Sequence, residues 1–266
     1  MSELINKSKR GVYIFPSLLT TGGMFFGFYA IMAALGGDYE HSAQAILAAG
    51  VFDGLDGRVA RAMNATSAFG KEYDSLADFL SFGIAPAVLI YLWALAPFQR
   101  VGWAAAFLYA VCGALRLARF NVQQHVIQDE RVSKRYFQGL PIPAAAGVVA
   151  AMILFYHDLG IHTQGENVVT LWRWLPLLLT FMLGILMVST IRFRSMKDFH
   201  WHRQRPFLTL VGVVVFIAVL TIQMASTLFL VSWAYLLSAL HSHREYLQLL
   251  AEGKEIEEDE VEDLTV

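Results

Sequence analysis

Four aspartates in one stretch of the chain are the side chains best suited to chemistry. Asp53 and Asp56 lie three residues apart, and Asp74 and Asp78 lie four apart. On helices, both spacings place the two carboxylates of a pair on one face. If a turn brings the two helices side by side, the four carboxylates converge. Such a set of oxygen donors suits Mg²⁺, Mn²⁺ or Ca²⁺ rather than zinc.

The residues around the aspartates favour close approach of a charged ligand. Gly57 and Ala60 lie one helical turn beyond the first aspartate pair, and Gly70 lies one turn before Asp74. Small side chains at these positions leave backbone and cation accessible. Arg61 ends the same stretch and carries a planar donor set that matches phosphate oxygens. A single aspartate near a helix end can equally be a solvated cap, but this combination indicates phosphate chemistry.

The composition is that of a polytopic membrane protein. Of 266 residues, 56% are hydrophobic and only 16% are charged, and the mean hydropathy is +0.50. Soluble domains typically contain about 25% charged residues. The first apolar run is too long for a cleavable signal peptide, so we expect it to stay as a membrane helix. No P-loop, zinc spacing or nucleic-acid motif is present, so no nucleic-acid partner is expected.

The apolar runs predict an all-α membrane bundle of about eight transmembrane helices. The first six form the expected catalytic core, in a domain at 1–195. Two further helices are expected in 196–243, because the apolar stretch after residue 207 is too long for one span and weakens near 221–226. An acidic cytoplasmic tail is expected at 244–266. Because carboxylates at membrane depth are costly without a partner, the aspartates in the second and third spans indicate a functional site.

Basic residues predict the orientation. With the amino terminus in the cytoplasm, all but two of the 20 lysine and arginine residues lie in inner segments. The two exceptions are Arg100 and Arg173. The positive-inside rule therefore places the aspartates and both termini at the cytoplasmic face of a bacterial-type inner membrane.

The pattern D-x2-D-G-x2-A-R-x8-G-x3-D-x3-D resembles the signature of the CDP-alcohol phosphatidyltransferase family. The resemblance implies that Asp53, Asp56, Asp74 and Asp78 bind Mg²⁺ or Mn²⁺, and that Asp78 is also the general base. It further implies a homodimer and attack of an alcohol on CDP-diacylglycerol with release of CMP. The positions that it assigns to CDP-diacylglycerol are Asp56, Gly57, Arg61, Ser67 and Gly70.

Two later segments, 115–122 and 137–146, look like the phosphatidylserine synthase branch of that family. This resemblance implies L-serine as the alcohol. Serine brings a carboxylate that an arginine can bind through two hydrogen bonds. Arg116 and Phe120 are one helical turn apart and are the first candidates for that pocket, followed by Arg119 and Asn121. The arginines could instead be anchors for lipid headgroups at the inner surface.

Two other functions are compatible with the sequence. A related phosphatidyltransferase could use glycerol 3-phosphate or inositol in place of serine. Buried carboxylates also serve as ion-coupling sites in small membrane transporters, but the aspartate pattern is not repeated after residue 100. The chain departs from the family in having Ser17 and Gly23 where asparagine is common. This departure leaves contacts of Ser17 or Thr20 with the nucleotide uncertain.

Overall fold

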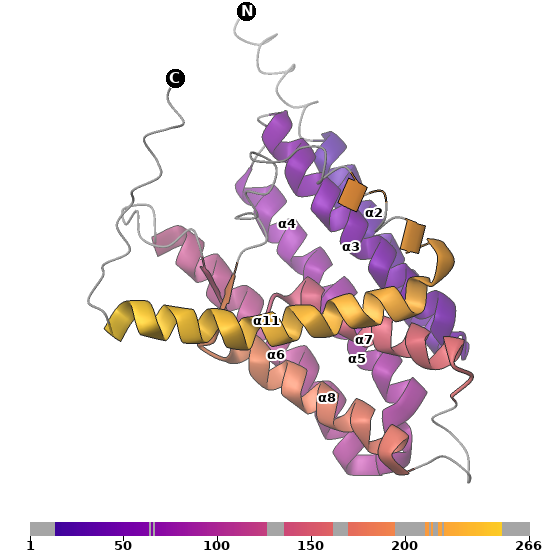
Figure 1. Ribbon diagram of the computed structural model, residues 1–266. Helices are drawn as coiled ribbons and strands as arrows, with labels where there is room; N and C mark the ends of the chain where they lie inside the picture. The colour runs from indigo at the N-terminus through magenta and orange to yellow at the C-terminus, as the bar shows by residue number, and fades with distance from the viewer. Residues whose placement is uncertain are drawn as a thin grey trace, which may run out of the picture.

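The computed structural model describes residues 14–63, 65, 67–126, 136–161, 170–194 and 221–251, and the single positions 211, 212, 214, 218 and 219. Within these residues the chain is a bundle of helices with one short two-stranded ribbon (Figure 1). The elements in chain order are α2 (Ile14–Leu35), α3 (Tyr39–Ala62), α4 (Ala68–Asp78), η1 (Phe79–Ile84), α5 (Ala85–Ile90), η2 (Tyr91–Leu95), η3 (Ala96–Phe98), α6 (Gln99–Val126), β1 (Tyr136–Gln138), α7 (Ile142–Asp158), α8 (Thr170–Val188), β2 (Arg192–Arg194) and α11 (Met224–Ala251).

Helices α2 and α3 form a hairpin that brings the first aspartate pair into the bundle. The turn contains Gly37 with a φ of 80°, and Asp38 caps α3 by accepting a hydrogen bond from the backbone N–H of His41 at 3.2 Å. Further along, the buried hydroxyl of Ser42 donates to the carbonyl of Ala30 at 2.7 Å. These contacts hold the two helices together at the end remote from the aspartates.

The third predicted span is an arm of four consecutive helical pieces, α4, η1, α5 and η2. A π-helical turn, η1, follows directly after Asp78. Pro86 has no N–H to donate to the carbonyl of Phe82 one turn earlier. The buried hydroxyl of Tyr109 on α6 donates to that carbonyl instead, at 3.2 Å. At Gln99, which has a φ of 49°, the chain turns and α6 packs back along the arm.

Close packing of α2 against the arm depends on Gly27. A Cβ atom added there would lie only 2.8 Å from the Cα of Ser81 in η1. Gly23 and Gly27 form a small-xxx-small face, the pattern that lets membrane helices pack closely. Ser81 also donates a hydrogen bond to the carbonyl of Gly23 at 3.3 Å. The contact brings the start of η1, and therefore Asp78, against α2.

Helix α7 lies at the centre of the bundle, where it contacts α3, α5, α6, α8 and α11. Most of its residues are buried. The segment before it is strand β1, which pairs antiparallel with β2. Gly139 follows β1 with a φ of 80°, and an added Cβ would overlap the carbonyl oxygen of Met187. Apart from this ribbon of three-residue strands, every element of the described residues is a helix, as the sequence predicted.

Helix α11 lies across the other long helices in Figure 1 and contacts α7 and β2. The described helix is interrupted at Gln223, within the predicted break at 221–226. It continues to Ala251, beyond the expected start of the acidic tail at residue 244. Residues 195–210 and 252–266 lie outside the described residues.

Two described helical stretches, Phe15–Leu35 and Ala68–Val122, are long and apolar enough to cross a membrane. The second one folds back on itself at Gln99. Large apolar side chains on α2 point outward, with exposed fractions of 62% for Phe25 and 55% for Phe28. These features agree with a helical membrane protein. The number of spans, eight, stays a prediction.

Candidate functional site

The aspartates come from two helices that meet at a short connection. Asp53 and Asp56 lie in the second half of α3, and Asp74 and Asp78 lie in the second half of α4. Helix α4 begins after Ser67, whose hydroxyl accepts a hydrogen bond from the backbone N–H of Gly70 at 2.9 Å. This N-cap fixes where α4 starts. The register of α4 in turn sets which of its residues face α3.

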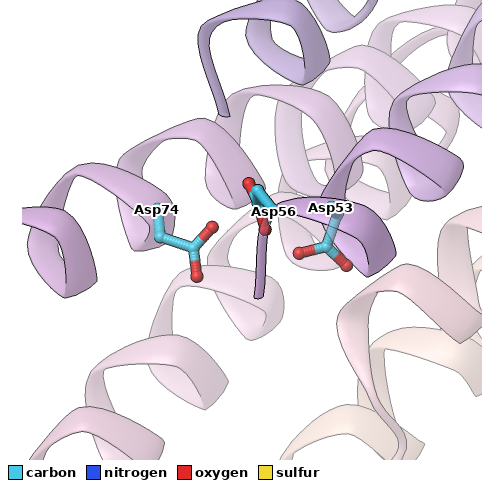
Figure 2. A group of neighbouring side chains, drawn as sticks. All are labelled: Asp53, Asp56 and Asp74. Atoms are coloured by element: carbon cyan, nitrogen blue, oxygen red, sulfur yellow. The ribbon is translucent and has the colours of Figure 1, made fainter. Parts of the chain in front are cut away.

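Three of the four carboxylates converge. Asp53, Asp56 and Asp74 each offer one oxygen, and these oxygens all lie within 4.8 Å of one another. Figure 2 shows Asp56 between the other two in this view, with the carboxylates directed toward a common space. Asp78 does not belong to this group of three, but it lines the same small cavity. The two helices therefore do bring the predicted pairs together.

The cavity is lined by α2, α3, α4 and η1. Its lining residues are Thr20, Gly23, Ala49, Asp53, Asp56, Asp74, Ala77, Asp78, Ser81 and Phe82. Besides the four aspartates, only small, hydroxyl or apolar side chains contribute. From the first helix, Thr20 and Gly23 line this space, whereas Ser17 is not among the lining residues. Among the lining residues the carboxylates thus have no cationic side chain to offset their mutual repulsion.

The arrangement fits a divalent cation. Asp56 is only 5% exposed, and its Oδ2 has no hydrogen-bond partner among the described residues. Two ligands on opposite sides of Ca²⁺ lie at most about 5.2 Å apart, and about 4.2 Å for Mg²⁺. Carboxylate oxygens within 4.8 Å can therefore share one ion with shifts of at most about 0.6 Å. The positive charge would also offset the repulsion between the buried carboxylates.

The other residues assigned to CDP-diacylglycerol gather at the junction of α3 and α4. Arg61 is exposed in the last turn of α3, and its guanidinium lies beside Gly57, 3.5 Å from where a Cβ would be. Ser67 and Gly70 form the N-cap of α4. An exposed arginine beside a glycine is open to an anionic ligand. The role of Ser67 seen in the structure is to start the helix.

The residues assigned to serine lie at the end of α6. The Cζ atom of Arg116 is 5.9 Å from the centroid of the Phe120 ring, so both do share a helix face. Arg116 is half-buried, interacts electrostatically with Asp78, and its Nε has no hydrogen-bond partner in the described part of the chain. Arg119 is half-buried on the same helix. Arg116 therefore has donor capacity left for a ligand beside Asp78.

Asn121, the last residue assigned to serine, forms a hydrogen bond with Ser75 of α4 in the structure. Its Nδ2 donates to the hydroxyl of Ser75 at 3.0 Å, and that hydroxyl lies 3.3 Å from Asn121 Oδ1 and 3.1 Å from the carbonyl oxygen of Lys71. Ser75 follows Asp74 directly. The pair therefore ties the aspartate-bearing part of α4 to α6.

Sequence reasoning missed the polar contacts that hold α4 in place. Besides Ser75, the hydroxyl of Tyr73 lies 3.0 Å from the hydroxyl of Thr21 on α2. It also missed Tyr235 of α11, which interacts electrostatically with Arg116. Tyr73 and Ser75 flank Asp74 in the sequence and could have been found from that position. Tyr235 lies more than 100 residues from Arg116 in the chain, and no motif marks it.

The model of the CDP-alcohol phosphatidyltransferase family matches residues 13–182, which covers α2 to most of α8. The chain belongs to the CDP-alcohol phosphatidyltransferase family. The matched region contains every aspartate of the cavity. Helix α11 lies outside it. Family membership and the apolar helices together indicate a transferase of the membrane.

Several curated members of this family are similar to the chain. A CDP-diacylglycerol–serine O-phosphatidyltransferase from Helicobacter pylori is 38% identical over 205 residues, which is 75% of this chain and 80% of the relative. One of the same name from Bacillus subtilis is 35% identical over 185 residues, 68% of this chain and 90% of the relative. An archaetidylserine synthase from Methanothermobacter thermautotrophicus is 38% identical over 148 residues, 54% of this chain and 60% of the relative.

Proposed function

We propose that this chain is a divalent-metal-dependent CDP-diacylglycerol–serine O-phosphatidyltransferase. The observation that carries the proposal is the convergence of Asp53, Asp56 and Asp74 within 4.8 Å, in a member of the CDP-alcohol phosphatidyltransferase family. The names of the Helicobacter pylori and Bacillus subtilis relatives support serine as the acceptor. The product would be a phosphatidylserine, and the other product CMP.

In this reaction the hydroxyl oxygen of serine forms a bond to the phosphorus of the phosphatidyl group. The bond between that phosphorus and the oxygen of CMP breaks, and CMP leaves as a phosphate monoester. Asp53, Asp56 and Asp74 would hold the divalent ion, with Asp78 at the edge of the same cavity. Bound there, a divalent cation neutralises the pyrophosphate and stabilises the leaving phosphate.

Asp78 is the residue that we assign to the proton of the serine hydroxyl. It lines the cavity but lies outside the group of three close carboxylates, so it is the one left available as a base. Arg61 would bind phosphate oxygens of the nucleotide from the end of α3. Gly57 leaves room beside it. Ser67 and Gly70 would contribute through the start of α4.

Arg116 is assigned to the carboxylate of serine. Its guanidinium is half-buried, interacts with Asp78 and has an unused Nε donor among the described residues. A carboxylate bound there would bring the serine hydroxyl toward the proposed base. Phe120 packs under the guanidinium, and Arg119 would add positive charge nearby.

The proposal includes the location of the active site and the organisation of the protein. We place the active site at the cytoplasmic face of a bacterial-type inner membrane, where serine and the nucleotide-activated lipid are both available. The proposed enzyme is a homodimer with eight membrane helices and both termini in the cytoplasm. Its catalytic domain would be 1–195, followed by two helices in 196–243 and the tail at 244–266.

An acceptor assay tests the proposal. Purified protein in detergent is given CDP-diacylglycerol and either L-serine, glycerol 3-phosphate or inositol, with and without EDTA, and released CMP is measured. We expect CMP release with serine alone, its loss with EDTA, and its recovery with excess Mg²⁺ or Mn²⁺. Release with glycerol 3-phosphate but not with serine would overturn the choice of acceptor.

Two substitutions of aspartate sharpen the assay. Asp78→Asn removes the proposed base and should abolish turnover while CDP-diacylglycerol still binds. Asp38→Asn makes the same chemical change at an exposed turn and should leave turnover as in the parent. Equal activity in both variants would exclude Asp78 as the base.

A further inference from the structure

Helix α2 is the element that joins the two aspartate-bearing helices. Among the described residues, α3 packs extensively on α2, and α4 packs mainly on α2 and on η1, which continues it. Helices α3 and α4 themselves make few close backbone contacts. The position of Asp74 relative to Asp53 and Asp56 therefore depends on how α4 is held on α2.

A hydrogen bond from Tyr73 holds α4 on α2. The phenol oxygen lies 3.0 Å from Oγ1 of Thr21. The hydroxyl of Thr21 donates to the carbonyl of Ser17 at 2.7 Å. Because a threonine hydroxyl has only one hydrogen, the phenol is the donor in the bond to Thr21. The bond thus joins the neighbour of Asp74 to the neighbour of Thr20, and both Asp74 and Thr20 line the cavity.

The ring of Tyr73 is itself held by its own helix. Phe69, one turn earlier, stacks on it with the ring centroids 5.9 Å apart and the planes at 7°. The stack restricts the rotation of the ring, so that less conformational entropy is lost when the phenol bonds to α2. Tyr73 is half-buried and is not among the residues that line the cavity. It can therefore act on the cation site only through the position of α4.

The carboxylates of the site oppose this arrangement. Oxygens of Asp53, Asp56 and Asp74 lie within 4.8 Å of one another, so their negative charges repel when no cation is bound. The repulsion pushes α4 away from α3, and few direct contacts between the two helices resist it. The hydrogen bond to α2 acts against this separation.

We propose that Tyr73 is a positioning residue that, through its hydrogen bond to Thr21, holds Asp74 within reach of the shared divalent cation before the cation binds. The inference rests on the cation site of the proposed function. When a hydrogen bond of this kind is lost, a smaller fraction of the protein has the arrangement that binds the ion. The apparent affinity falls by the same factor as that fraction.

A double-mutant cycle on Mn²⁺ binding tests this role. The metal-free protein in detergent is titrated with Mn²⁺, and free Mn²⁺ is measured by electron paramagnetic resonance. Tyr73→Phe removes the donor and keeps the ring, Thr21→Val removes the acceptor and keeps the shape, and a third variant combines both. The matched control is Thr227→Val in α11, because the Thr227 hydroxyl donates to the carbonyl four residues earlier at 2.7 Å, as the Thr21 hydroxyl does. Thermal melting of each variant checks that it is folded.

We expect each single substitution to raise the Kd for Mn²⁺ about threefold to tenfold, which corresponds to about 0.6 to 1.4 kcal/mol for one hydrogen bond between membrane helices. The double variant should bind little more weakly than either single variant, because both substitutions break the same bond. Thr227→Val should bind as the parent does. A merely structural tyrosine would lower the melting temperature and leave the Kd unchanged. That result, or additive effects of the two substitutions, would overturn the inference.

The parent and Asp74→Asn separate this inference from the proposed function. If Asp74→Asn loses the Mn²⁺ site while Tyr73→Phe binds as tightly as the parent, only the role of Tyr73 is wrong. A parent that binds no Mn²⁺ would overturn the cation site and this inference with it. If the cycle gives the expected result but the parent releases no CMP from CDP-diacylglycerol with serine, the proposed reaction is wrong and the role of Tyr73 is supported.

Discussion

Replacing Asn121 by alanine distinguishes the predicted from the observed role of this residue. The sequence assigned Asn121 to serine, whereas the structure pairs it with Ser75, the neighbour of Asp74. In the structure, Asn121→Ala removes the bond from Nδ2 to the Ser75 hydroxyl at 3.0 Å. It also removes one of two possible acceptors for the single hydroxyl hydrogen, the other being the carbonyl of Lys71 at 3.1 Å. One bond is therefore lost outright and a second in part.

Each such bond contributes about 1 kcal/mol net. The loss of about 1 to 2 kcal/mol of restraint on α4 sets an upper limit of about fivefold to thirtyfold on the fall in kcat. We expect that fall with KM for serine unchanged, measured by CMP release at varied serine. Ser75→Ala should reproduce it, and the double variant should lose little more, because both substitutions break the same contact. A rise in KM for serine with an unchanged kcat would refute the reasoning and restore Asn121 to the acceptor pocket.

Two further predictions concern packing and charge. Gly27→Ala forces a methyl group against the backbone of Ser81, so thermal melts should show a free energy of unfolding lower by about 1 to 3 kcal/mol. In Gly23→Ala the added Cβ would have its nearest contact at 3.5 Å, so this variant should melt close to the parent. Equal melting temperatures of the two variants would contradict the close contact at Gly27. Hydrogen bonding to Asp38 raises the pKa of His41 above its usual 6.5, so NMR titration should show that value falling toward 6.5 in Asp38→Asn. The same contact lowers the pKa of Asp38 below its usual 3.8, so the contribution of this pair to stability is complete between pH 3.8 and pH 6.5. It is lost as the pH rises through the raised pKa of His41, and as the pH falls through the lowered pKa of Asp38. An unshifted titration of His41 would exclude the pair.

The aspartate site could be predicted from the sequence because its information is local. Spacings of three and four residues place each pair on one helix face, and a short connection brings the faces together. These local rules predict the convergence that the structure shows, with one carboxylate oxygen each of Asp53, Asp56 and Asp74 within 4.8 Å of one another. They do not say which carboxylates share one ion, and Asp78 falls outside the close group.

The contacts of the residues assigned to serine depend on tertiary packing, so they could not be predicted from local spacing. The partner of Asn121 is 46 residues away on α4. The ribbon of β1 and β2 joins strands of three residues each, too short to show an alternating pattern. Tyr235 packs against the core because α11 contacts α7, and no local pattern in either segment specifies that contact.

Divalent-cation binding is the most direct test of the central claim, that aspartates from α3 and α4 hold one shared ion. The measurement is titration of the metal-free protein in detergent with Mn²⁺, followed by electron paramagnetic resonance. We predict a Mn²⁺ site that is lost in Asp56→Asn and in Asp74→Asn, one residue from each helix, and kept in Asp38→Asn. Mn²⁺ binding that persists unchanged in either of the first two variants would contradict the shared site.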